Sequence, residues 1–234
     1  MIPFCDAACL LRIPAICFSR VRTPAAEAKS GNAACDIEIR QLARTNQGRG
    51  SMRDLIVTEN ITIDGVVEAT EGWFTAARGE DDMSDFETAL RKQRKAADAL
   101  LLGRVTFEQM RGYWPSQTDD TTGITDYLND VSKHVVSSTL HDPEWDRTSV
   151  LRSVDEIPAL KSETGGDIVT TGSIRLVREL IAAGLVDEYR LFIYPVVLGR
   201  GQRLFADATE VPRLRLVENQ PFRSGVVLQR YRTA

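Results

Sequence analysis

Cysteine is missing from most of this sequence. The four cysteines of the 234-residue chain all lie among its first 35 residues, at Cys5, Cys9, Cys17 and Cys35, and they form no C-x-x-C pair typical of a zinc site. His134 and His141 are the only histidines. The sequence therefore predicts no metal site. Beyond residue 35 it excludes disulfides and thiol catalysis, which fits a cytoplasmic protein.

Other absences narrow the class of protein. No run approaches the roughly 18 apolar residues of a membrane span, and the formal net charge of −4 argues against a protein that coats nucleic acid. Neither G-x-G-x-x-G nor G-x-x-x-x-G-K-[ST] occurs, so the dinucleotide fold of that fingerprint and the P-loop are not indicated. We expect a small-molecule partner, with no membrane and no nucleic acid.

The first 51 residues differ in character from the rest. They carry seven Lys and Arg against four Asp and Glu, whereas residues 52–234 carry 22 against 29. The early segment has no sustained periodicity and ends in the polar, Gly-containing sequence "RTNQGRGS", which is typical of a linker. We predict a disordered N-terminal extension over 1–51 and one folded domain over 52–234.

Within that domain, strand-like and helix-like segments alternate. This pattern predicts an α/β fold with a mostly parallel sheet covered on both faces. A C-terminal hairpin around Ser224-Gly225 adds an antiparallel edge, so the sheet should be mixed. Strands are predicted over 53–65, 98–103, 133–139, 167–173 and 186–199, helices over 83–97, 106–114, 122–132 and 173–184, and the hairpin over 213–232.

Three of the predicted strands end in small polar residues, in "LLLGRVT", "VVSSTL" and "VTTGSI". In an open α/β sheet, ligands bind outside the carboxyl ends of the strands, where helix N-termini favour phosphate. Gly103 and Gly172 would allow close approach of the backbone, and Arg104 could pair with a phosphate. Such residues also cap helices for purely structural reasons, and Arg104 could instead pair with Glu108. Three corners together favour a nucleotide site.

These motifs resemble a known family. "LLGRVTFE" looks like the Gly-Arg-x-Thr corner of the dihydrofolate reductase superfamily, and "TIDGVVE" resembles a turn in the reductase domain of bacterial riboflavin-biosynthesis deaminase-reductases. "KHVVSSTL", "TTGSIRLVREL" and "GLVDEYRLFIYPVVLGRGQRLF" continue the match in order, over about residues 52–234. The resemblance implies a dihydrofolate-reductase-like three-layer α/β/α fold with bound NADPH.

The resemblance also implies which residues hold the cofactor. Gly103, Arg104, Val105 and Thr106 would hold the adenosine-side phosphates, with Arg104 on the 2′-phosphate. Ser137, Ser138 and Thr139 would lie near the adenosine, and Thr171, Gly172, Ser173, Ile174 and Leu176 would surround the pyrophosphate. The chain departs from the family where Gly172-Ser173 replaces the usual Gly-Gly pair. It has no deaminase zinc site, and we find no counterpart of the Arg that grips a folate carboxylate, so we do not expect dihydrofolate as the substrate.

The hydride chemistry would belong to the cofactor, and a carboxylic acid with a raised pKa could supply the proton. The candidates are Asp64, Asp85 and Glu87, of which Glu87 resembles the acidic residue of dihydrofolate reductases in position. Each has a plain alternative, because Asp-Gly forms turns and acidic residues complement helix N-termini. Trp73, Phe86, Tyr113 and Trp114 could wall a planar heterocycle or simply fill the core.

Two classes of function follow. The first is an NADPH-dependent reductase of a small heterocyclic, imine or carbonyl substrate, resembling 5-amino-6-(5-phosphoribosylamino)uracil reductase. The alternative is a non-catalytic nucleotide-binding or scaffold protein that retains the fold. The long apolar segment "YRLFIYPVVLG" would invite pairing if it lay at an exposed edge, and we predict a homodimer.

Overall fold

The computed structural model describes residues 52–68, 72–73, 83–205 and 213–234. The predicted disordered extension, residues 1–51, lies outside the described residues. The described part contains an eight-stranded sheet with the order β4-β3-β2-β5-β1-β6-β8-β7. Its strands are β1 (Leu55–Thr62), β2 (Ala97–Gly103), β3 (Ser132–Val136), β4 (Thr148–Leu151), β5 (Asp167–Thr170), β6 (Glu188–Tyr194), β7 (Leu214–Pro221) and β8 (Val227–Thr233).

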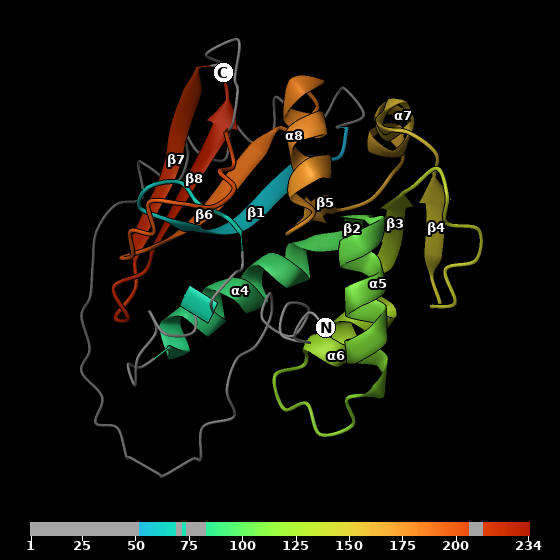
Figure 1. Cartoon of the computed structure of the whole chain (residues 1–234), viewed down its shortest axis with the longest axis horizontal. Coiled ribbons are helices and arrows are strands. Elements are labelled where there is room, and N and C mark those ends of the chain that lie inside the picture. Colours follow the sequence, from blue (N-terminus) through green and yellow to red (C-terminus); the bar gives the residue numbers. More distant parts are fainter. Residues whose placement is uncertain (1–51, 69–71, 74–82, 206–212) are drawn as a thin grey trace, which may run out of the picture.

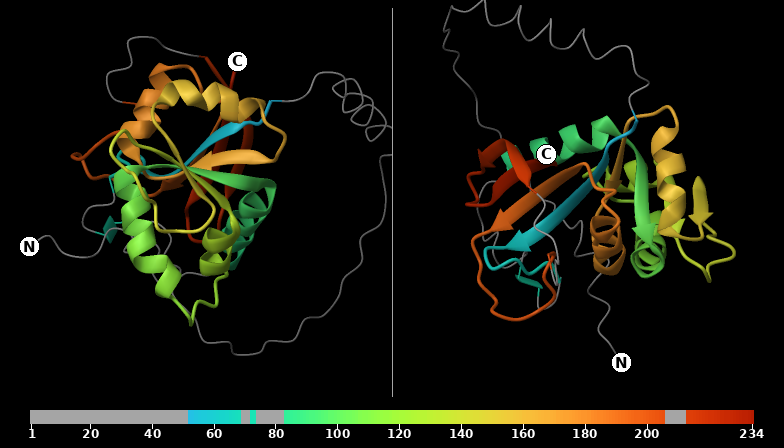
Figure 2. Two further views of the ribbon diagram at one scale, coloured as in Figure 1. Left: turned by 90° about the vertical axis from the view of Figure 1, so that its right-hand side faces the viewer. Right: turned by 90° about the horizontal axis from the view of Figure 1, so that it is seen from above.

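The strands β1 to β6 pair with one another in parallel, and β8 pairs antiparallel with both β6 and β7. This confirms the mixed, mostly parallel sheet and the C-terminal hairpin. The helices are α4 (Ser84–Ala96), α5 (Arg104–Tyr113), α6 (Ile124–Asp130), α7 (Ile157–Ser162) and α8 (Ile174–Ala182), with short 3-10 turns η2 (Trp114–Ser116) and η3 (Val154–Glu156). Figures 1 and 2 show α7 and α8 on one face of the sheet and α4, α5 and α6 on the other.

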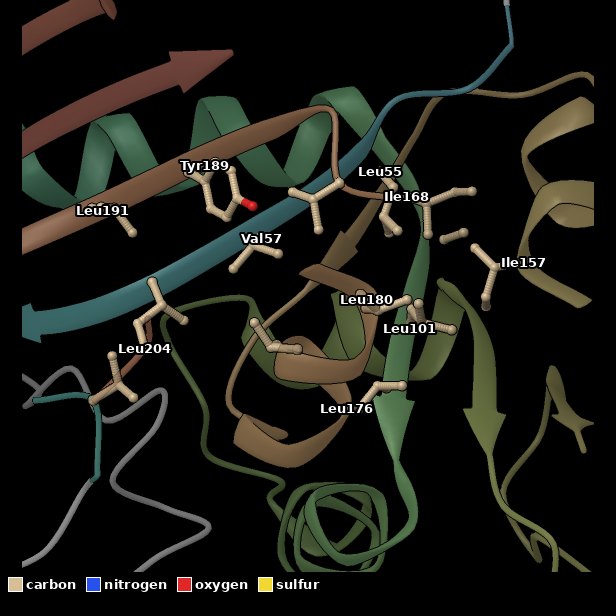
Figure 3. Packing of buried hydrophobic residues seen from close by; sticks show 14 of the residues in the cluster. Leu55, Val57, Leu101, Ile157, Ile168, Leu176, Leu180, Tyr189, Leu191 and Leu204 are labelled. Atoms are coloured by element: carbon tan, nitrogen blue, oxygen red, sulfur yellow. The ribbon is translucent and has the colours of Figure 1, made fainter. Parts of the chain in front are cut away.

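Alternation along the strands builds a separate core on each face. Leu55 and Val57 of β1 and Leu101 of β2 pack with α7 and α8 (Figure 3). Leu100 and Leu102 point the other way and pack with α5 and α6. The central strands β2 and β1 are therefore covered on both faces, as their continuous apolar runs predict.

The strand β4, the turns η2 and η3 and the helix α7 were not predicted from the sequence. The strand β4 has four residues and is half exposed, so its apolar signal is weak. The turn η3 and helix α7 are short, although Ser153 and Glu156 form a capping box at the start of η3, which is readable in the sequence as "SVDE".

The apolar segment from which we predicted a dimer does not form an exposed edge of the sheet. The segment Glu188–Tyr194 forms β6, which lies between β1 and β8 and is almost fully buried. The edge of the sheet on that side is β7, which is mostly exposed along its length. The apolar pattern of β6 therefore reflects burial inside the sheet and gives no evidence for a dimer.

Candidate active site

The carboxyl ends of four parallel strands lie side by side in the order β3, β2, β5, β1. The three polar corners predicted from the sequence follow β3, β2 and β5, so they occupy one continuous edge of the sheet. Helices α5 and α8 begin directly at two of these corners. Their first-turn amides have no partner within the helix, and their dipoles favour an anion.

Hydrogen bonds join the corners after β2 and β5. The Gly103 N–H donates to Ser173 Oγ at 2.9 Å, and the Ser173 N–H donates to Thr106 Oγ1 at 3.1 Å. A Cβ atom placed on Gly103 would lie 3.6 Å from both Cβ and Oγ of Ser173. Two backbone N–H groups at this edge, those of Gly103 and Ser173, are therefore already hydrogen-bonded to side-chain oxygens of the protein.

The corner after β5 has a left-handed backbone. Gly172 has a φ of +59° and Ser173 a φ of +48°, a region that costs a non-glycine residue roughly 1–2 kcal/mol. Ser173 is the position at which the sequence departs from the Gly-Gly pair of the resembled family. Its hydroxyl oxygen accepts the hydrogen bond from the Gly103 N–H.

Arg104 forms the ion pair that the sequence analysis considered as the alternative to phosphate binding. Its Nη1 lies 3.1 Å and 2.9 Å from the two carboxylate oxygens of Glu108. Both side chains are substantially exposed, so the pair contributes little to stability. The neighbouring Val105 is 59% exposed, which leaves the first turn of α5 accessible from solvent.

In the corner after β3, the side chain of Ser137 stabilises the turn. The hydroxyl of buried Ser137 accepts hydrogen bonds from the backbone N–H groups of Thr139 and Leu140. Ser138 and Thr139 are exposed. This corner offers Ser138 and Thr139 to a ligand, whereas the Ser137 side chain shapes the turn.

Two of the predicted cofactor residues belong to the core. Leu176 is buried between α8 and the sheet, as Figure 3 shows, and Ile174 packs against the same cluster. These side chains anchor α8, so what they could offer a pyrophosphate is the backbone of the first helical turn.

A cavity of about 90 Å³ lies between α4, α5, α6 and the sheet, with room for several waters or a small ring. Its wall is largely apolar and includes Phe86 and Leu90 of α4, Met110 of α5 and Phe192 of β6. The polar lining residues are Thr58, Glu59, Asn60, Gln93, Arg94, Tyr127 and Thr171. The last of these, Thr171, directly precedes the left-handed Gly172, so the cavity borders the β5 corner.

Several of these polar groups are only partly satisfied. The Gln93 amide oxygen accepts from the Thr58 hydroxyl at 3.4 Å, and its amide nitrogen is buried with no hydrogen-bond partner among the described residues. No hydrogen bond or close ion pair joins Arg94 to another residue of the described ranges, and burial lowers the pKa of its guanidinium. Arg94 also borders a wider surface groove that contains Arg91, Lys95 and Arg147 as well as Asp98 and Asp130.

Of the aromatic residues proposed to wall a heterocycle, the structure places one in the cavity. Phe86 lines it. Trp73 packs edge-on against Tyr194, and Trp114 is buried in the core under α5 with Tyr113 against it. For these three the alternative of ordinary core packing describes the structure.

The predicted proton donors lie outside the cavity. Asp64 accepts hydrogen bonds from Thr62, Leu198 and Gly199, and the bond from the Thr62 hydroxyl does most to lower its pKa, to about 2. Its role is therefore to tie the turn after β1 to the segment after β6. A raised pKa, which proton donation at neutral pH requires, is the opposite of what this site produces.

Asp85 does not have the expected pKa either. Partial burial opposes ionisation, but hydrogen bonds from the backbone N–H groups of Arg223 and Phe86, with the charge of Arg223, hold its pKa below the ordinary value. Glu87 lies on α4 at 4.0 Å from Arg91 and is not among the residues that line the cavity. Its proposed role as an acid stays a prediction.

Glu59, which the sequence analysis did not single out, is the carboxyl group that the fold buries most deeply at this edge. It is 3% exposed, and its Oε1 has no hydrogen-bond partner among the described residues. Burial raises its pKa well above the ordinary value, although a hydrogen bond from the Gly172 backbone opposes the shift. The signal was readable in "VTEN", where three polar residues interrupt a strand that is otherwise apolar.

Comparison with solved structures identifies the fold as that of dihydrofolate reductase and its relatives. A riboflavin biosynthesis protein described as putative, from Shewanella sp. PV-4, superposes with a TM-score of 0.61 at 16% identity, over 77% of this chain and 99% of the other. Dihydrofolate reductase from Enterococcus faecalis, complexed with NADP(H), gives a TM-score of 0.52 at 18% identity, over 77% and 96% of the two chains.

A bifunctional deaminase and 5-amino-6-(5-phosphoribosylamino)uracil reductase from Thermotoga maritima gives a TM-score of 0.55 at 14% identity, over 85% of this chain and 60% of the other. The protein is thus of the dihydrofolate-reductase-like class. Residues 53–228 match the RibD C-terminal domain, and the chain belongs to that family. The uncharacterized protein YyaP of Bacillus subtilis is 32% identical over 180 residues, which cover 75% of this chain and 92% of YyaP.

Among the described residues there is no helix long and apolar enough to cross a membrane. The same ranges contain no group of three or more His, Cys, Asp and Glu side chains placed to hold a metal ion.

Proposed function

We propose that the protein is an NADPH-dependent reductase that transfers a hydride to a C=N or C=O carbon of a small heterocyclic substrate. One observation carries the proposal. The cavity under α4 and the phosphate-binding type of corner after β5 meet at Thr171, so a cofactor on the corners and a ring in the cavity would lie next to each other. Hydride transfer requires this proximity of donor and acceptor.

The corners fit the cofactor in part. When bound, NADPH would supply the hydride, and the proton would come from water. The free first-turn amides of α5 and α8 suit the pyrophosphate, whereas the N–H groups of Gly103 and Ser173 are already taken by side-chain oxygens. Arg104 would leave Glu108 for the 2′-phosphate, since a two-pronged bond to phosphate is stronger than an exposed ion pair.

The cavity points to the class of substrate. Its apolar walls and the amides of Asn60 and Gln93 suit an uncharged planar ring with polar edges, because amides donate and accept hydrogen bonds but carry no charge. Arg94 and the groove beside it, with four basic and two acidic side chains, suit an anionic group attached to that ring. A phosphorylated pyrimidine of the kind named for the Thermotoga maritima protein combines both features.

Loss of NADPH absorbance with a panel of pyrimidines, pterins and quinones tests the proposal. We expect turnover with a pyrimidine that carries a phosphorylated sugar and at least about tenfold slower turnover without the phosphate, the loss of one charge-assisted contact. Gln93→Leu should raise the KM for the ring, while the exposed variant Glu179→Gln serves as its control. Tight NADPH binding without turnover of any compound would favour the non-catalytic nucleotide-binding protein instead.

A further inference from the structure

The side chain of Glu59 lies on the α8 face of the sheet. Along β1 it alternates onto the same face as Leu55, Val57 and Ile61, which all belong to the core under α8. Glu59 is also among the residues that line the cavity under α4. The register pairs Glu59 with Leu191 of β6. On the other side Val57 pairs with Thr170 of β5, and two residues further along Glu59 stands beside Gly172.

Within the part of the chain that the structure describes, no charged group near this carboxyl shifts its pKa. Among the described residues its polar contact is the Gly172 backbone, and Oε1 is buried without a partner there. The described elements packed against it contribute no charge that shifts its pKa. Arg178 of α8 donates to the Arg203 carbonyl, Asp64 accepts from Gly199 beyond the end of β1, and Tyr189 of β6 packs in the core. Arg175 of α8 is exposed. Burial alone therefore disfavours the ionised form.

Gly172 connects this group to the proposed cofactor site. The same left-handed corner that would face the pyrophosphate has its Gly172 amide turned to Glu59. An ionised Glu59 would place a negative charge one residue behind the position of a negatively charged ligand, inside a region that excludes water. Two like charges in such a place favour the state in which one of them is neutralised.

We propose that Glu59 is a positioning residue that is uncharged when the cofactor is bound, and that cofactor binding transfers a proton from solvent to its unpartnered oxygen. As the carboxylic acid, Glu59 keeps the Gly172 hydrogen bond and holds the corner without repelling the pyrophosphate. The proton returns to solvent when the cofactor leaves. The inference rests on the proposed function, because it takes the Gly172-Ser173 corner as the pyrophosphate site.

Calorimetric titration with NADPH from about pH 5 to about pH 9, in buffers of different ionisation enthalpy, measures the proton taken up. We expect the wild type to take up as much as one proton per NADPH above the pKa of Glu59 in the free protein, and its affinity to fall by about tenfold per pH unit there. Glu59→Gln should show neither effect. Glu179→Gln, on the exposed side of α8, should behave as the wild type does. Because all three proteins are titrated with the same cofactor, ionisation of the cofactor's own phosphate, with a pKa of about 6, cancels.

Infrared difference spectra of the wild type with and without NADPH give a second readout that does not depend on the folding of a variant. Binding at high pH should convert a carboxylate band into a carboxylic acid band. NADPH binding with equal pH dependence in the wild type and Glu59→Gln, and no acid band, would overturn this inference alone. If the wild type does not bind NADPH at all, the proposed function is wrong and the inference is overturned with it.

Discussion

Gly103 and Ser173, which are 70 positions apart in the chain, are joined by a hydrogen bond of 2.9 Å from the Gly103 N–H to Ser173 Oγ. With the return bond from the Ser173 N–H to Thr106 Oγ1, it makes the corners after β2 and β5 one unit. A change at either corner should therefore alter the geometry of both.

Ser173 offers a direct test of this coupling. Ser173→Ala removes the acceptor and keeps a side chain at a left-handed φ of +48°, so we expect a loss of about 1 kcal/mol, the net value of one hydrogen bond. Ser173→Gly loses the same bond but relieves the backbone strain, worth roughly 1 kcal/mol. Its stability should therefore be close to that of the wild type. Urea denaturation measures both. A glycine variant less stable than the alanine variant would contradict the account.

Arg104 should discriminate between the two nicotinamide cofactors. Arg104→Ala removes a two-pronged contact to the 2′-phosphate, worth about 1.5–3 kcal/mol, so NADPH should bind at least about tenfold more weakly while NADH is nearly unaffected. Fluorescence titration measures both affinities. Glu108→Gln releases Arg104 from its present partner and should not weaken NADPH binding. Equal losses for the two cofactors in Arg104→Ala would make the corner structural.

Glu188 should make stability depend on pH in the acid range. It is 2% exposed and lies within 3.1 Å of the guanidinium groups of Arg190 and Arg230. Burial would raise its pKa, but the hydrogen bonds from these two arginines outweigh burial and hold the pKa below the ordinary value. Because the folded-state pKa is lowered, the stabilisation is present above the unfolded pKa of about 4.3 and is lost as the pH falls through the folded value.

Glu188→Gln should accordingly lower the free energy of unfolding by about 3–5 kcal/mol at neutral pH, as for a broken buried ion pair. The loss should be smaller at low pH. Glu218→Gln is the matched control, since Glu218 also bonds Arg230, at 2.7 Å, but is 33% exposed. Its loss should stay within about 1 kcal/mol. Denaturation curves at several pH values measure the stability of both variants. A loss of stability in Glu188→Gln that does not change with pH would contradict the lowered pKa of Glu188.

A chain that begins at Met52 should fold on its own. The core clusters of the described residues are built from positions between Leu55 and Tyr231, and the family match spans 53–228. We expect the shortened protein to melt cooperatively and within a few degrees of the full chain. Calorimetry on both proteins is the measurement, and loss of a cooperative transition would show that residues 1–51 contribute to the fold.

We also propose a homodimer, now through the edge strand β7. Leu214, Leu216 and Val217 on this strand are 36–50% exposed, and an unpaired apolar edge favours association. Light scattering at tens of micromolar should give twice the monomer mass, and Leu216→Lys should shift the protein towards the monomer. A monomer mass for the wild type would refute the proposal.

The order of the main elements and the position of the corners could be predicted from the sequence. Continuous apolar runs fix β2 and β5 as strands buried on both faces, and the spacing of Val177 and Leu180 fixes the buried side of α8. Since the carboxyl ends of adjacent parallel strands share one edge, the polar residues after them had to come together there. These features depend on neighbours in sequence, so local patterns suffice to identify them.

The roles of the carboxylates were decided by the tertiary structure. Asp64 is held ionised by the neighbouring Thr62 hydroxyl together with two amides more than 130 positions away, and Asp85 by Arg223, whereas Glu59 meets no charge that shifts its pKa among the described residues. An acidic residue has the same intrinsic pKa wherever it stands in a sequence. What shifts it is desolvation and the charges and donors that the fold brings near, and many of those come from distant parts of the chain.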